Sequence, residues 1–207
     1  MNIEEWLHTL VLQLGETDWL QWTGLILGVT EVLLARNNNI FLYPAGIVSS
    51  AISVYLLWFA GLYGESALSF YYVVMSIYGW WYWIKKKDKP PVKITRSSKR
   101  DWIMVASIVL GGYVILYFIL EHLTPSTVPF WDAWVTSTAW AGMWLLARRK
   151  LENWILLNIS NACAIPLLFY KGLPLYAVLT IILFIVAVQG YFIWQKKIKT
   201  YPHEQST

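Results

Sequence analysis

Hydrophobic residues form seven long blocks along the chain, separated by polar connections. A helix of about 20 apolar residues crosses the hydrocarbon core of a bilayer and satisfies its own backbone hydrogen bonds there. The pattern therefore predicts an all-α membrane protein with seven transmembrane helices. We expect these helices at residues 19–35, 40–61, 67–84, 102–120, 130–147, 154–170 and 173–194.

The N-terminal segment, residues 1–17, has a different pattern. Its apolar residues recur at helical spacing, at Ile3, Trp6, Leu7, Leu10, Val11 and Leu14. This spacing predicts a short amphipathic helix on the membrane surface. The segment carries Glu4 and Glu5 where a cleavable signal peptide would have basic residues, so we expect the first span to act as the insertion signal.

Short matches recur along the chain at an offset of 111 or 112 residues. The matched pairs are Trp22 with Trp134, residues 33–36 with 145–148, Gly61-Leu62 with Gly172-Leu173, and Gly79-x-x-x-Trp83 with Gly190-x-x-x-Trp194. Matches in the same order predict two copies of a three-helix unit, at residues 18–86 and 126–197. Residues 87–125 would then hold a basic loop and a linker helix, and residues 198–207 a cytoplasmic tail.

The linker helix determines how the two copies are related. One extra span returns the second copy to the direction of the first, so the sequence predicts a parallel 3+1+3 repeat with the substrate path between the bundles. At an offset of 112, the alignment pairs Trp154 with Leu42.

Basic residues gather in alternate connections. Residues 85–100 hold eight Lys or Arg against one Asp, and more basic residues occur at 36, 148–150 and 196–199. With seven spans these segments share one side, which the positive-inside rule assigns to the cytoplasm. We therefore expect the N-terminus outside and the C-terminus inside. The basic loop lacks interleaved aromatic residues and is flanked by spans, which disfavours nucleic-acid binding.

Composition excludes several kinds of site. Hydrophobic residues make up 57% of the chain and charged residues only 14%, whereas soluble domains have about a quarter charged residues. Cys163 is the single cysteine and the three histidines are far apart, so no disulfide and no zinc site is expected. The spans also lack a catalytic constellation. We predict neither an enzyme nor a cofactor or metal.

Polar residues at membrane depth are costly and often mark a pathway. Trp154, Asn158 and Asn161 share one face of the sixth span by their spacing. A flat ring followed by two amides would suit a planar polar ligand, while an interhelical hydrogen-bond clamp explains the same amides. Gln189 in the seventh span allows both interpretations.

The first half contributes further candidates. Glu31 lies near the inner end of the first span, where it could pair with Arg36 or attract a cation. Tyr72 and Tyr78 are polar positions of the third span, and Asn153 immediately precedes Trp154. Serines and threonines within the spans more often bond their own helix backbone.

The sequence resembles the Pnu family of vitamin transporters, above all its nicotinamide riboside transporters. The stretches that carry the resemblance are residues 43–47 (YPAGI), 76–83 (SIYGWWYW), 145–154 (LLARRKLENW), 165–167 (IPL) and 170–173 (YKGL). The resemblance implies a SWEET-like homotrimer in the bacterial inner (plasma) membrane. It also implies facilitated diffusion of a small vitamin or nucleoside, which a cytoplasmic kinase phosphorylates and traps. It further implies that Trp154 and Asn161 face the substrate, to which the spacing adds Asn158.

One departure bears on the substrate. The family pattern has a second Trp three residues after Trp154, and this chain has Leu157 there. Thiamine, also a flat cation, is therefore the alternative vitamin, because aromatic stacking and cation–π attraction serve both ligands. A SWEET-like sugar transporter and a non-transporting structural or signalling membrane protein are the alternatives from other classes.

Overall fold

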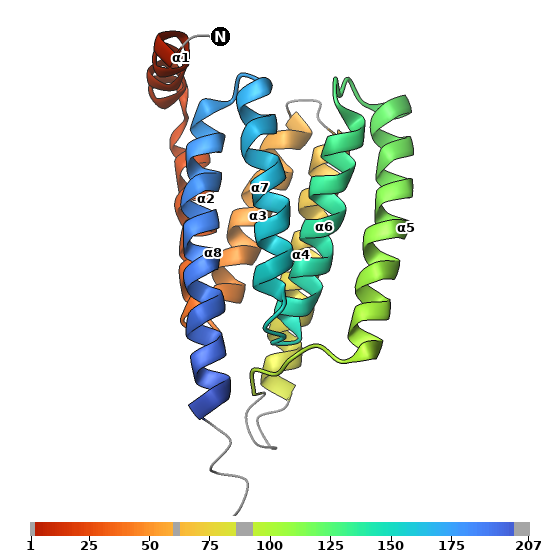
Figure 1. Cartoon of the computed structure of the whole chain (residues 1–207). Coiled ribbons are helices and arrows are strands. Elements are labelled where there is room, and N and C mark those ends of the chain that lie inside the picture. Colours follow the sequence, from red (N-terminus) through yellow and green to blue (C-terminus); the bar gives the residue numbers. More distant parts are fainter. Residues whose placement is uncertain (1–2, 60–62, 86–92, 201–207) are drawn as a thin grey trace, which may run out of the picture.

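The computed structural model describes residues 3–59, 63–85 and 93–200 of the 207-residue chain. These residues form eight α-helices, with one isolated β-bridge. The helices are α1 (Ile3–Glu16), α2 (Trp19–Arg36), α3 (Leu42–Phe59), α4 (Tyr63–Lys85), α5 (Lys99–Leu123), α6 (Pro129–Ala147), α7 (Asn153–Tyr170) and α8 (Pro174–Thr200). Helices α2 to α8 stand side by side, and consecutive ones run in opposite directions (Figure 1).

Local sequence explains where several helices begin. Asp18 caps α2 and forms a capping box with Gln21, and Ser98 does the same for α5 with Asp101. Helix α6 starts at Pro129, whose missing N–H is not needed in the first turn. These signals place helix starts within a few residues of the hydrophobic blocks.

Four of the described helices, α3, α5, α7 and α8, are long and apolar enough to cross a membrane. The sequences of α2, α4 and α6 are richer in Trp, Tyr and polar residues, which lowers their hydropathy. All seven nevertheless pack in one bundle (Figure 1). The all-α prediction is confirmed, and the count of seven spans stays a prediction.

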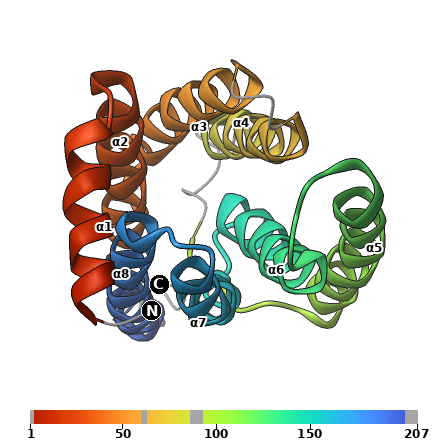
Figure 2. The same ribbon diagram turned by 90° about the horizontal axis from the view of Figure 1, so that it is seen from above.

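Six helices form a closed ring. Helices α2, α3 and α4 pack in series, as do α6, α7 and α8, and the series meet where α4 contacts α6 and α8 contacts α2. Helix α5 packs on α6 outside this ring (Figure 2). The linker helix thus lies beside the ring and contributes mainly to one of its walls.

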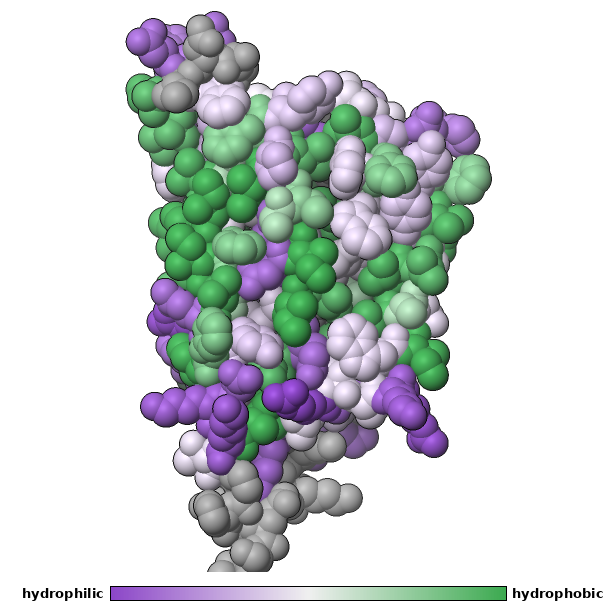
Figure 3. All heavy atoms as spheres, in the orientation of Figure 1, coloured by the Kyte–Doolittle hydropathy of each residue, from purple (hydrophilic) through white to green (hydrophobic). Residues whose placement is uncertain are grey.

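The outer surface of the bundle is apolar along its middle. Green apolar side chains cover much of this face in Figure 3, and hydrophilic side chains gather toward its lower end. Large hydrophobic residues are more than half exposed on several helices, among them Ile26, Val114 and Phe192. Soluble monomers rarely expose such extensive apolar surface, so this belt is suited to lipid.

The largest hydrophobic core closes one end of the ring. We call this the basal end; it is where α2, α4, α6 and α8 finish. The basal core consists of Ala35, Leu42, Tyr43, Trp83, Leu146, Leu151, Trp154, Ala187 and Trp194. Because all six ring helices or their connections contribute to it, the basal core holds both halves together.

Helix α1 lies across the opposite end of the bundle, over α2 and α8 (Figure 2). The Gln13 side chain donates to the Gly172 carbonyl at 3.0 Å and accepts from the Leu175 backbone N–H at 3.2 Å. Trp6 also stacks on Phe169 with ring centroids 4.7 Å apart. These contacts tie the N-terminal helix to the turn between α7 and α8.

Candidate functional site

Two tryptophans join the halves of the ring at its basal end. The Trp83 indole N–H in α4 donates to the carbonyl oxygen of Ala147, 3.0 Å away at the end of α6. The Trp194 indole N–H in α8 donates to that of Ala35, 3.1 Å away in the last turn of α2. The two donors, Trp83 and Trp194, are one of the pairs matched in the sequence, and so are the two acceptors, Ala35 and Ala147. The last helix of each half is therefore hydrogen-bonded to the first helix of the other half.

Trp154 belongs to this basal structure. It is fully buried, and its ring meets Trp194 edge-on at 5.5 Å. It also lies against Gly190, where a Cβ atom would come within 2.7 Å of the ring. The stacking surface expected from the sequence is thus covered by α8.

Tyr43 makes the equivalent contacts in the first half. It meets Trp83 edge-on at 5.0 Å and lies directly against Gly79. The contacts therefore pair Trp154 with Tyr43, and the alignment of Trp154 with Leu42 is wrong. The reason is that Tyr43 follows Ala35 by eight residues, whereas Trp154 follows the matching Ala147 by seven, so the offset has already changed from 112 to 111 at Tyr43.

A groove of about 540 Å³ occupies the part of the ring farther from the basal core. Helices α2, α3 and α8 supply most of its lining, and α7 contributes Leu168. Most of the lining is apolar, and the polar side chains are Gln21, Ser49, Ser53, Tyr176 and Thr180. Ser49 donates to the Gly24 carbonyl at 2.8 Å, so this serine is engaged in joining α3 to α2.

Glu31 lies about one helical turn beyond the groove-lining Gly28, toward the basal core. Its carboxylate rests on Gly46 of α3 so closely that a Cβ atom at residue 46 would overlap the carboxylate oxygens. The carboxylate is also within electrostatic reach of the Tyr43 and Tyr72 hydroxyls. The structure thus brings Glu31 and Tyr72, which the sequence predicted separately, into one cluster.

The amide residues of α7 occupy different surroundings. Asn153 is fully buried and donates to the Lys150 carbonyl at 2.6 Å, so it braces the turn between α6 and α7. Asn158 lines a shallow apolar hollow of about 380 Å³ between α7 and α8. Its side-chain oxygen is buried without a hydrogen bond among the described residues. Asn161 is partly buried.

Gln189 and Tyr78 are less buried than Asn153. Gln189 is exposed and accepts a 2.6 Å hydrogen bond from Arg36. Among the described residues Arg36 forms no ion pair with Glu31, and the pairing left open by the sequence is therefore not formed. Tyr78 is partly buried and packs near the rings of Trp81 and Tyr82.

Comparison with known proteins identifies the family. A family model described as nicotinamide mononucleotide transporter matches residues 18–196, from the cap of α2 almost to the end of α8. The chain belongs to the nicotinamide mononucleotide transporter family. This result confirms the resemblance seen in the sequence, and together with the apolar helices it makes the chain a multi-pass membrane protein.

Individual relatives are distant but cover most of the chain. The nicotinamide riboside transporter PnuC of Escherichia coli (strain K12) is 22% identical over 205 residues, with 86% of each protein covered. The riboflavin/roseoflavin transporter RibM of Streptomyces davaonensis is 21% identical over 159 residues, with 74% of each covered. A crystal structure of the vitamin B3 transporter PnuC is 24% identical and has a TM-score of 0.71, covering 97% of this chain and 94% of that one. This last match shows that the fold is shared.

Leu157 departs from the pattern that the sequence shares with this family. A Cβ atom on Gly142 would lie 2.9 Å from the Leu157 side chain, so Leu157 sits in the contact between α6 and α7. It also packs against the basal core. In this member of the nicotinamide mononucleotide transporter family, position 157 thus supports helix packing.

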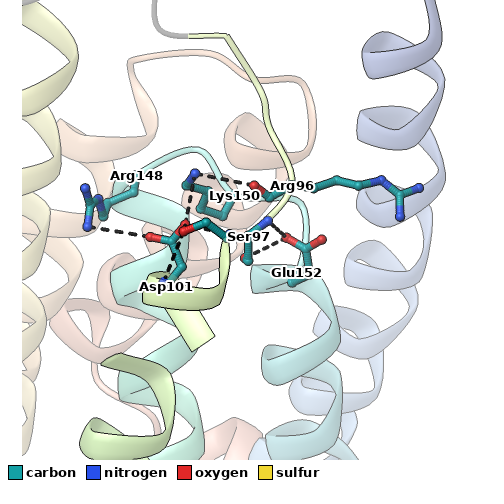
Figure 4. A network of polar contacts seen from close by, with 7 residues as sticks. Arg96, Ser97, Asp101, Arg148, Lys150 and Glu152 are labelled. Atoms are coloured by element: carbon teal, nitrogen blue, oxygen red, sulfur yellow. Dashed lines mark hydrogen bonds and ion pairs between the residues drawn. The ribbon is translucent and has the colours of Figure 1, made fainter. Parts of the chain in front are cut away.

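A polar network at the basal end was not predicted from the sequence (Figure 4). Asp101 is 5% exposed and pairs with Lys150 at 3.1 Å and with Arg148 at 3.7 Å. Glu152 accepts two hydrogen bonds of 2.7 Å from the backbone N–H and the hydroxyl of Ser97. The motif around residues 148–152 therefore fixes the segment before α5 to the turn between α6 and α7. The capping pattern Ser98-x-x-Asp101 was the one local signal of it.

Arg149, in the same turn, has a separate role. Its guanidinium carbon lies 3.4 Å from the centre of the Trp83 ring, and its backbone has a φ of +54°. Burial lowers the pKa of Arg149 to about 10, and Tyr43 acts in the opposite direction. Arg149 stays charged at neutral pH and contributes a cation–π contact at the basal core.

Proposed function

We propose that this protein moves nicotinamide riboside across the bacterial inner (plasma) membrane by facilitated diffusion. The family match over residues 18–196 carries the proposal. The E. coli relative, named as a nicotinamide riboside transporter, supports the choice of substrate. A cytoplasmic kinase would trap the substrate by phosphorylation, so that net uptake needs no energy source in the transporter itself.

The proposed architecture is seven spans in a SWEET-like parallel 3+1+3 repeat, with the N-terminus outside and the C-terminus inside. The crossed contacts of Trp83 and Trp194 support it, because equivalent residues of the two units make equivalent bonds. Helix α1 would lie on the outward-facing surface of the inner membrane. In this frame the basal core closes the cytoplasmic side, and the groove beside α2, α3 and α8 lies toward the outside. The homotrimer is part of the same proposal.

The proposed substrate path runs through the ring between the two units. Glu31 and Tyr72 contribute from the first unit, and Trp154, Asn158 and Asn161 from the second. The covered ring of Trp154 would become available only when α7 and α8 move apart at Gly190. Asn153, Gln189 and Tyr78 flank this path, and their observed contacts suit support of its walls.

Counterflow in proteoliposomes tests the function directly. Vesicles loaded with unlabelled nicotinamide riboside should accumulate the labelled compound without ATP, an ion gradient or a kinase. Parallel vesicles loaded with thiamine, riboflavin or glucose separate the proposed substrate from other vitamins and from sugars. Exchange of thiamine or glucose without exchange of nicotinamide riboside would overturn the assignment.

A further inference from the structure

The single carboxylate in the cluster of Glu31, Tyr43 and Tyr72 has no partner of its own. Among the described residues, no hydrogen bond or ion pair engages Glu31. A carboxylate at membrane depth is costly unless it is paired or hydrated. Glu31 is only partly buried, so part of its surface stays accessible.

The packing of α2 against α3 places the Glu31 carboxylate on Gly46. Glu31 is five residues from Arg36, a distance of about 7.5 Å along the helix axis. A flexible Glu could extend toward that basic end, but here its carboxylate rests on Gly46. Any larger residue at position 46 would fill this space. The glycine therefore provides room for the charge between the groove and the basal core.

The neighbours of the carboxylate suit a flat organic cation. Tyr43 is 2% exposed, and its buried hydroxyl oxygen has no hydrogen-bond partner in the described part of the chain. Tyr72 supplies a second aromatic ring within electrostatic reach of Glu31. Aromatic faces attract cations, and a carboxylate attracts them more strongly over longer distances. The buried Tyr43 hydroxyl could accept or donate a hydrogen bond to a ligand once α3 and α4 move apart at Gly79.

The second half offers no matching acid. Counting by the offset of 112, the residue corresponding to Glu31 is Met143, and by the offset of 111 the one corresponding to Gly46 is Leu157. Leu157 reaches toward Gly142, so that contact is apolar. The two units thus differ in charge at equivalent depth, and a cation would be held on the side of the first unit.

We propose that Glu31 is the counter-ion for the positively charged ring of the transported compound, so that this protein selects cationic ring compounds over their uncharged analogues. The inference rests on the proposed function, since the pyridinium ring of nicotinamide riboside carries the positive charge. The proposal also gives a role to Gly46, whose missing side chain leaves room for the carboxylate. An uncharged vitamin such as riboflavin would leave the carboxylate unpaired and bind more weakly.

The test compares nicotinamide riboside with its dihydro form, which has nearly the same shape but no ring charge. Binding to the purified protein is measured by titration calorimetry, for the wild type, for Glu31→Gln and for the exposed control Glu16→Gln. We expect E31Q to weaken binding of the cation at least tenfold and binding of the dihydro form less than threefold. E16Q should change neither. An equal loss for both ligands, or no loss, would overturn the proposal.

The wild type alone gives a second test that does not depend on how the variant folds. It should bind the cation at least tenfold more tightly than the dihydro form, and equal affinities contradict the counter-ion role. Thiamine and riboflavin separate this proposal from the function. Binding of thiamine that is sensitive to E31Q, without binding of nicotinamide riboside, would refute the substrate and support the counter-ion. Exchange of nicotinamide riboside that E31Q leaves unchanged would support the substrate and refute the counter-ion role.

Discussion

The indole N–H of Trp194 donates a hydrogen bond to the carbonyl oxygen of Ala35, 159 residues away in the chain. Trp83 makes the equivalent bond to Ala147. Each bond uses a donor near the end of one unit and a carbonyl in or just beyond the last turn of the other unit's first helix. These contacts connect the two units at the end of the ring where the basal core is packed.

Replacing Trp194 or Trp83 by Phe should remove the donor and keep an aromatic ring in place. Trp83→Phe leaves the buried Ala147 carbonyl without its indole donor, so we expect it to cost roughly 1–3 kcal/mol. For a chain of this size, that corresponds to a fall of several degrees in the midpoint of thermal unfolding. Trp194→Phe should cost less, because the Ala35 carbonyl still accepts from the Asn38 backbone N–H at 2.9 Å. Thermal unfolding in detergent is the measurement. Trp102→Phe is the matched control, because Trp102 is 44% exposed on α5; an equal shift for W102F would contradict the prediction.

Gly190→Ala should destabilise the protein, whereas Gly111→Ala should not. A Cβ atom at position 190 would press on the Trp154 ring, while one at position 111 has nothing within 4 Å. Alanine also favours helix over glycine by about 0.5–1 kcal/mol, so G111A should be neutral or slightly stabilising. Unfolding midpoints of both variants measure the difference. Equal unfolding midpoints for G190A and G111A would contradict the close contact between α7 and α8.

Gly46→Ala tests the position of the Glu31 carboxylate. An added methyl group should displace that carboxylate, because its oxygens now occupy the space. We expect at least a fivefold weaker binding of nicotinamide riboside and a smaller effect on its uncharged dihydro form. Titration calorimetry measures both, with G111A as the control for replacing a helical glycine. Unchanged binding of the cation would show that the observed position of Glu31 does not matter for the ligand.

Asp101→Asn should weaken the attachment of α5 to the turn between α6 and α7. Asparagine preserves most of the shape but loses the charge that pairs with Lys150 and Arg148. Hydrogen bonds to charged groups contribute about 1.5–3 kcal/mol, so the unfolding midpoint should fall by several degrees. Hydrogen exchange should also accelerate in the first turns of α5. Asp18→Asn is the control: it caps α2 at an exposed site where Asn serves equally well.

Much of the fold could be predicted because it depends on local pattern. Hydrophobic blocks long enough to span lipid fixed the positions of α2 to α8, and helical spacing indicated α1. The repeated Gly-x-x-x-Trp pattern correctly indicated residues with equivalent roles, since Gly79 and Trp83 make the same contacts as Gly190 and Trp194. The single-residue gap, where the offset changes from 112 to 111, was harder to place. No matched residue lies between Arg36 and Gly61 to show where the extra residue of the first unit falls.

The candidate site was predicted less completely. Glu31 and Tyr72 were predicted as candidates because polar groups at membrane depth are conspicuous. Tyr43 and Gly46 were missed as site residues: Tyr43 reads as an ordinary interfacial aromatic, and glycine carries no chemical signal. Trp154 was predicted to face the substrate, but its spacing could not reveal that Gly190 covers its ring.

The sequence by itself determined that this is a helical membrane protein, where its helices lie and to which family it belongs. Hydropathy and motifs are properties of neighbouring residues, so they can be read without coordinates. Only the tertiary structure decided which side chains meet: Glu31 on Gly46, Trp154 on Gly190, and Ser97 with Glu152. Such contacts depend on the rotation and depth of each helix against its neighbours, which the packing of the whole ring sets.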